Sequence, residues 1–152
     1  MSRLNDIPIR IEPPARTGGL GGGVTAILSE LANLLVEVAK GGAPTSVDLR
    51  SLPMSPQDRT ELQSALGTGE VRATLDADGL SSLRETSVSG IWWIEHRNRE
   101  GELNAELIEV TPVPQILQSI ADDMATSARE LRERITAGAP RFIEGSEHAT
   151  RQ

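Results

Sequence analysis

The sequence predicts an α+β fold, an antiparallel β-meander sheet with helices packed mainly on one face. Two patterns predict it. Residues 24–40 repeat apolar side chains at the spacing of one helix face, whereas residues 70–77 alternate polar and apolar side chains, as a half-buried strand does. Further strand-like segments follow one another through short glycine-containing turns, which join antiparallel neighbours, and another helical segment comes last.

The first 23 residues are predicted to be a flexible N-terminal tail or linker. Three prolines are followed by the glycine-rich run from Gly18 to Gly23, and both residue types interrupt regular structure. A glycine run before a helix also suggests a phosphate-binding loop. Neither the Gly-Lys-Ser/Thr ending nor the dinucleotide-binding glycine spacing is present, so we interpret the run as a linker.

Two helices and a short strand are expected next. Val24 to Lys40 forms the first helix, because seven apolar residues fall on one face and Gly41-Gly42 ends it. Residues 46–50 are predicted to be a strand. A second helix begins after Ser55, a capping residue that is followed by proline, and it ends at the glycines beyond Leu66.

Four strands and a helix complete the predicted domain. The strands are expected at residues 71–77, 83–88, 91–97 and 102–110, and the two prolines after residue 110 bound the sheet. The last helix presents one apolar face, made of Ile120, Met124, Ala128, Leu131 and Ile135. The first and last helices are both expected to pack on the sheet. Residues 24–138 therefore form a single α+β domain, and residues 139–152 a C-terminal tail.

The stretch GIWWIEHR places two of the three aromatic residues side by side, at Trp92 and Trp93. Neighbours on a strand point to opposite faces, so the hairpin register decides which tryptophan is internal. Pairing even positions of the first strand with odd positions of the second collects Trp92 and Ile94 on an apolar face. The opposite parity mixes polar and apolar residues on both faces, although a bulged turn could support it. The preferred register predicts Trp92 in the core.

Trp93 is then expected on a mostly charged face, beside Ile91 and Ile108. A large aromatic residue in such a patch indicates a protein-interaction surface formed by these three residues. The alternative is that the N-terminal tail or the last helix of the same chain covers Trp93.

Composition excludes several classes of function. The net charge is −7, with 22 acidic against 15 basic residues and no basic stripe, so we expect no nucleic-acid partner. The absence of cysteine excludes disulfides and thiolate metal sites. The N-terminus lacks the apolar segment of a signal peptide and no apolar run approaches membrane-span length, so we expect a cytoplasmic protein without a membrane partner.

No catalytic, cofactor-binding or metal-ligating set is predicted. Glu95 and His96, near Glu106 and Glu109, suggest an acid–base or metal site, but adjacent strand residues diverge. His96 is expected to be a partly buried hairpin residue. Two histidines without cysteine or tyrosine make an enzyme the less favoured class.

Residues 45–117 carry two strings that together resemble a known family. They are TSVDLRSLPMSPQDRTELQSALGTGEV and RETSVSGIWWIEHRNREGELNAELIEVTPVPQIL. In order and spacing they resemble the HupH/HyaF hydrogenase expression/formation proteins, in their C-terminal-type domain. The resemblance covers about residues 24–118 and offers no catalytic motif to carry over.

The resemblance implies a non-enzymatic accessory factor in nickel–iron hydrogenase maturation. Its expected mode is chaperone-like binding of a hydrogenase subunit, with the iron–sulfur small subunit as one candidate, or of another maturation protein. The alternative from the residues is a self-associating module, a homodimer formed through Ile91, Trp93 and Ile108.

Overall fold

The structure is a computed structural model that describes residues 19–138. It forms two compact units, one ending at Pro112 and the other beginning at Val113. The first unit contains α1 (Gly22–Ala39), β1 (Thr45–Asp48), α2 (Pro56–Leu66), β2 (Arg72–Asp76), β3 (Leu80–Glu85), β4 (Ile91–Arg97) and β5 (Leu103–Val110). The second contains the 3₁₀ turn η1 (Gln115–Leu117) and α3 (Ala121–Thr136). The N-terminal tail was predicted for residues 1–23, of which residues 1–18 lie outside the described residues; α1 begins at Gly22, so the last two predicted tail residues belong to this helix. The predicted C-terminal tail, residues 139–152, lies wholly outside the described residues.

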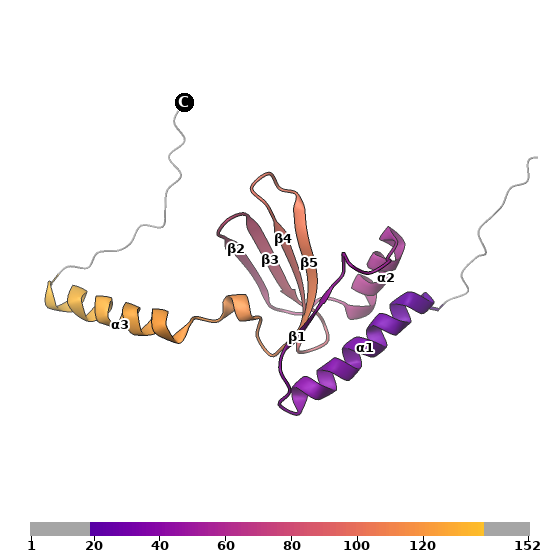
Figure 1. Ribbon diagram of the computed structural model, residues 1–152, viewed down its shortest axis with the longest axis horizontal. Helices are drawn as coiled ribbons and strands as arrows, with labels where there is room; N and C mark the ends of the chain where they lie inside the picture. Colours follow the sequence, from indigo (N-terminus) through magenta and orange to yellow (C-terminus); the bar gives the residue numbers. More distant parts are fainter. Residues whose placement is uncertain (1–18, 139–152) are drawn as a thin grey trace, which may run out of the picture. The chain divides into compact units, whose positions relative to one another are not determined.

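The predicted α+β fold is confirmed. One antiparallel sheet has the strand order β1-β5-β4-β3-β2, so β2 to β5 form a meander and β1 joins the far side of β5 (Figure 1). Strand β3 begins three residues earlier than predicted. The turn at Gly79 is tight, with the Ala77 N–H donating to the Gly79 carbonyl, and the residues after Glu85 form the loop to β4.

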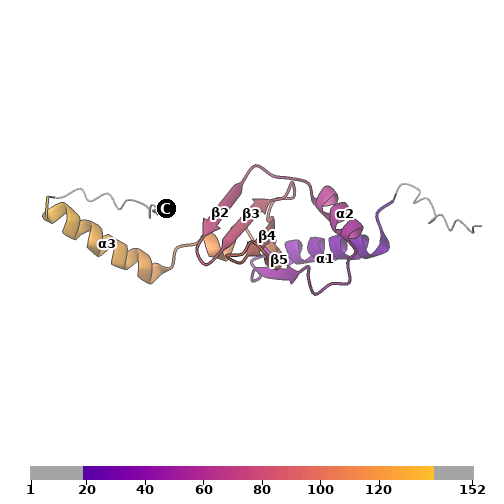
Figure 2. The ribbon, with the colours of Figure 1, turned by 90° about the horizontal axis from the view of Figure 1, so that it is seen from above.

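Helices α1 and α2 lie beside each other on the same side of the sheet (Figures 1 and 2). The apolar face predicted for α1 is the face that packs. Val24 and Leu31 are buried, and Leu28, Leu35 and the other apolar positions of this face are partly buried against the core. By length and mean hydropathy, α1 meets the requirements of a membrane span, contrary to our expectation, and one face of it packs against the core.

Helix α2 begins with the predicted serine cap. The Ser55 hydroxyl accepts from the Asp58 backbone N–H at 3.1 Å, and the Asp58 carboxylate accepts from the Ser55 N–H at 3.0 Å. This reciprocal capping box satisfies the first free donors of the helix. The helix then presents Leu62 and Leu66 to the same core as α1.

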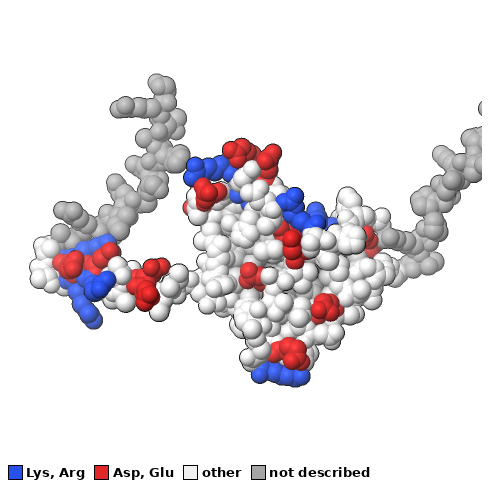
Figure 3. Space-filling model, in the orientation of Figure 1, with Lys and Arg blue, Asp and Glu red and all other residues white. Residues whose placement is uncertain are grey.

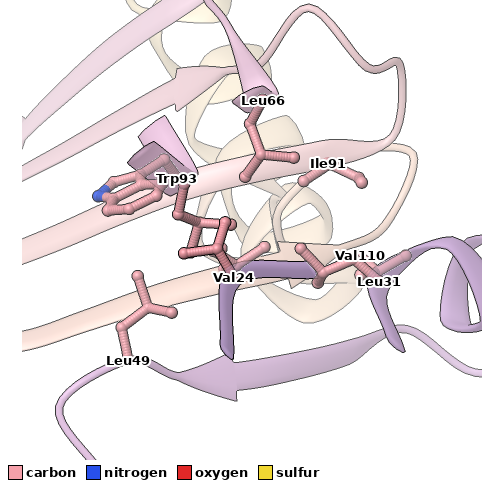
Figure 4. Close-up of a cluster of buried hydrophobic side chains, with 9 residues drawn as sticks. Val24, Leu31, Leu49, Leu66, Ile91, Trp93 and Val110 are labelled. Carbon is pink, nitrogen blue, oxygen red and sulfur yellow. The ribbon is translucent and has the colours of Figure 1, made fainter. Parts of the chain in front are cut away.

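The hairpin register of β4 and β5 is the one predicted up to an irregularity between His96 and Arg97. Both tryptophans are buried, Trp92 as predicted and Trp93 contrary to the prediction. Trp93 pairs with Ile108 and Trp92 with Glu109. Trp93, only 1% exposed, belongs with Ile91, Ile108 and Val110 to the core beneath α1 and α2 (Figure 4). Trp92 is also buried, on the other face, where its indole N–H donates to the Thr111 carbonyl at 3.1 Å.

The error has a physical cause. The prediction for Trp93 rests on the polarity of each face along the whole hairpin, whereas the core cluster occupies only one end of the strands. Glu95, Arg97 and Asn104 share the Trp93 face but lie toward the turn, outside that cluster. Helices therefore cover the apolar end of a face that is charged at its other end.

The second unit is dominated by α3, whose bounds agree with the prediction. No residue of this helix is buried, although all 16 are described. Its apolar face leaves Ile120, Met124, Leu131 and Ile135 between 55% and 71% exposed. The expected packing of this helix on the sheet stays a prediction, as does the single domain over residues 24–138.

Candidate functional site

The predicted interaction residues lie inside the protein. Ile91, Trp93 and Ile108 are at most 2% exposed, and α1 and α2 of the same chain cover them. The prediction that they form a surface patch is therefore wrong. A partner could not reach them without displacing both helices.

A buried carboxylate lies next to Trp93. Glu106 lies two residues before Ile108 on β5, so both side chains are on the same face, and Glu106 is 2% exposed. Its Oε1 accepts from the Trp93 indole N–H at 3.1 Å. Its Oε2 lies 3.1 Å from Nη2 of Arg59, which comes from α2. Both oxygens of this carboxylate are thus held by groups from different elements.

A second arginine completes this polar cluster. The Arg84 guanidinium on β3 lies 5.1 Å from the centroid of the Trp93 ring, within the range of a cation–π contact. Arg84 is the cross-strand neighbour of Trp93, which is why the two side chains share a face. Trp93 is therefore fixed at its edge by Glu106 and on its face by Arg84.

The cluster of Arg59, Arg84, Trp93 and Glu106 connects α2 to the sheet. Arg59 does not form a two-pronged fork, because neither its Nε nor Oε2 of Glu106 makes a directed hydrogen bond among the described residues. The cluster contains no nucleophile. Its carboxylate accepts one hydrogen bond, from Trp93, and forms an ion pair with Arg59. Its chemistry is that of an orienting contact, which sets the Trp93 rotamer and the position of α2.

The predicted register implies that Glu106 lies on the Trp93 face, but its role was not predicted. The available signal was a single carboxylate between Trp93 and Ile108 in the predicted register. A charge at such a position requires a partner when it is buried. The partner, Arg59, is 47 positions earlier in the chain and on another element, so sequence spacing could not identify it.

The suspected acid–base set diverges as expected. Glu95 pairs with Arg97 at 3.2 Å on one face, whereas His96 lies on the other, 2.8 Å from the Ser81 hydroxyl. His96 is partly buried, in agreement with the prediction. Within residues 19–138 no group of three or more histidine, aspartate or glutamate side chains could hold a metal ion.

The outer edge of β2 is the second feature of interest. The Glu85 N–H donates to the Val71 carbonyl, and the Ala77 N–H donates to the Gly79 carbonyl, so odd-numbered backbone groups of this strand face β3. Alternate residues of a strand point their hydrogen-bonding groups in opposite directions. The N–H and C=O groups of Arg72, Thr74 and Asp76 therefore point away from the sheet, and these residues are exposed.

Charges on the surface are mixed rather than segregated. On the face drawn in Figure 3, lysine and arginine side chains lie next to aspartate and glutamate side chains. Arg99, for example, lies 2.6 Å from Asp78 where the two hairpin turns meet.

Comparison with known proteins identifies similarity to hydrogenase expression proteins. Residues 23–137 match the family model described as HupH hydrogenase expression protein, C-terminal conserved region. The hydrogenase expression/formation protein HoxQ of Azotobacter vinelandii is 36% identical over 90 residues, which cover 59% of this chain and 32% of that protein. HupH of Rhizobium leguminosarum bv. viciae is 26% identical over 120 residues, covering 79% of this chain and 42% of that protein.

A solved structure agrees with the fold. The hydrogenase expression protein HupH from Thiobacillus denitrificans superposes with a TM-score of 0.72 at 38% identity, covering 77% of this chain and 98% of that one. The matched part of this chain spans between about a third and two fifths of the length of the two curated relatives.

Proposed function

The chain belongs to the HupH hydrogenase expression protein family, and from this premise we propose that it is an accessory protein in nickel–iron hydrogenase maturation. Its role is to bind a hydrogenase subunit or another maturation factor in a chaperone-like manner, without catalysing a reaction. The iron–sulfur small subunit is the first candidate, and a cytoplasmic location is part of the proposal. Family membership supports a role in hydrogenase maturation, and the edge of β2 supports the mode of binding.

The observation that carries the binding mode is the outer edge of β2, which pairs with no strand other than β3 within residues 19–138. Three outward pairs of backbone groups, at Arg72, Thr74 and Asp76, are arranged as a strand template. An extended segment of another protein can add to such an edge through main-chain hydrogen bonds. Segments of a subunit that has not finished folding are extended and have unpaired backbone groups, so they are suitable ligands for this edge.

The side chains beside the edge limit the ligand to a segment with both polar and apolar residues. Arg72 and Asp76 provide one charge of each sign on one face of the strand, and Ala73 and Leu75 provide a half-buried apolar surface on the other. A strand that alternates apolar and charged residues would pair with both faces.

The test is a pull-down of hydrogenase subunits and maturation factors by Thr74→Pro and Thr74→Ala variants. Proline removes the outward N–H of residue 74 but leaves the ladder to β3 intact, since that N–H does not bond to β3. We expect Thr74→Pro to reduce capture at least about tenfold, as loss of about 1.4 kcal/mol would, and Thr74→Ala to retain it.

Two outcomes would contradict the proposal at different levels. Equal capture by both variants would reject the β2 edge as the binding site while leaving the maturation role intact. Failure of the unmodified chain to capture any hydrogenase subunit or maturation factor would reject the function itself. Circular dichroism of both variants provides the folding control.

A further inference from the structure

The apolar face of α3 is the part of the structure most in need of a partner. The helix has 16 residues, and isolated helices of this length are only marginally stable in water. Its large apolar side chains are more than half exposed and all lie on one face. We call this face, formed by Ile120, Met124, Ala128, Leu131 and Ile135, the α3 stripe.

The α3 stripe is nearly palindromic. Ile120 and Ile135 are its ends, and Met124 and Leu131 are the next pair inward. Ala128 is at the centre. At 3.6 residues per turn the five positions fall within about 80° of the helix surface, so they form one straight stripe. A second copy of the helix, placed antiparallel, therefore presents a large apolar residue opposite each large apolar residue. The two copies of Ala128 lie on either side of the two-fold axis, offset by about one residue along the helix.

The charges of α3 select the antiparallel orientation. Asp122 and Asp123 lie in the first turn, and Arg134 lies in the last turn. An antiparallel pair brings the acidic end of each helix to the basic end of the other, and it also opposes the two helix dipoles. A parallel pair would place the four aspartates together. Asp123 and Arg134 lie on the same flank of the stripe. In a two-fold antiparallel pair this flank of one helix lies beside the same flank of the other helix, so Asp123 of one copy comes near Arg134 of the second.

From these observations we propose that two copies of the chain associate through α3, antiparallel, with a two-fold axis near Ala128. The small residue at the centre lets the helix backbones approach, and the larger residues pack on either side. The contact extends over about 24 Å, at 1.5 Å per residue. One pair of helices of this length buries less than the roughly 1,200 Å² of surface at which stable interfaces begin, so we expect a weak dimer with a dissociation constant in the micromolar range.

The surface of α3 away from the stripe does not take part. Thr126 lies on the opposite side of the helix, where its hydroxyl accepts from Arg129 at 3.1 Å. It is therefore the position for a matched control. This proposal is independent of the maturation role, because it concerns self-association through a different element from the β2 edge.

The first experiment is sedimentation equilibrium of the full chain over a wide concentration range. We expect a reversible monomer–dimer equilibrium for the unmodified chain. Leu131→Glu should weaken dimerisation at least about 30-fold, whereas Thr126→Glu should leave it within about twofold. Circular dichroism of the two variants provides the folding control. A chain that is monomeric throughout, or equal behaviour of the two variants, would overturn the proposal.

The second experiment fixes the orientation and uses the absence of cysteine from the chain. In an antiparallel pair, Ala128→Cys should form a disulfide-linked dimer on mild oxidation. Met124→Cys and Leu131→Cys should each cross-link poorly alone but readily when mixed. Strong self-linking of Met124→Cys would indicate a parallel pair and refute the arrangement. Restored dimerisation in Asp123→Arg combined with Arg134→Asp, after loss in Asp123→Arg alone, would support it.

Discussion

The buried carboxylate of Glu106 gives a stability prediction that can be worked from its contacts. Glu106→Ala leaves the Trp93 indole N–H without its acceptor in a buried position, which costs about 1–3 kcal/mol. Loss of the one buried methylene group, Cγ, adds about 0.8 kcal/mol. We therefore expect the free energy of unfolding to fall by about 2–4 kcal/mol, which overlaps the range of about 3–5 kcal/mol for breaking a buried ion pair.

Glu95 provides the matched control. It lies directly opposite Glu106 on β4 and on the same face of the sheet, and it too pairs with an arginine, Arg97, at 3.2 Å. Its side chain is 26% exposed, so water already solvates part of its charge and the ion pair with Arg97 contributes less to stability. Glu95→Ala should therefore cost no more than about 1 kcal/mol.

The measurement is urea unfolding followed by tryptophan fluorescence, because both tryptophans lie in the same sheet. The decisive quantity is the difference between the two alanine variants, since they share strand propensity and change in charge. If Glu106→Ala destabilises the protein no more than Glu95→Ala, the carboxylate does not connect α2 to the sheet as its geometry suggests. Glu106→Gln should be intermediate, because its amide oxygen can still accept from Trp93 but its charge opposite Arg59 is lost.

Two further predictions concern backbone geometry. Ser55→Ala should lower the free energy of unfolding by about 1 kcal/mol, since it removes the acceptor for the Asp58 N–H; a loss below a few tenths in urea unfolding would show that the capping box is dispensable. Gly79→Ala should be more damaging, because its φ is +131° and the added Cβ would collide with the Arg97 carbonyl oxygen. Gly101→Ala, where φ is +84° and nothing lies within 4 Å, should cost only the conformational strain of about 1–2 kcal/mol; equal thermal shifts for the two variants would refute the collision.

Local sequence determined the elements and the pairing of the hairpin. The apolar period fixed the face of α1, the Ser55 and Asp58 pair fixed the start of α2, and alternation placed most strands within a few residues of their bounds. These features depend on neighbours within about one helical turn or across one tight turn, so the chain encodes them locally. The even–odd register of β4 and β5 followed from the same alternation.

Which side of the sheet receives the helices was decided only by the tertiary structure. The faces of β4 both carry a tryptophan and an isoleucine, so alternation alone could not rank them. Helices α1 and α2 cover the Trp93 face because their leucines meet Ile91, Ile108 and Val110 there. That choice buries Glu106, which becomes tolerable because Arg59 and Trp93 reach it from other elements. Contacts between positions so far apart in the chain have no periodicity, and only the packed structure brings them together.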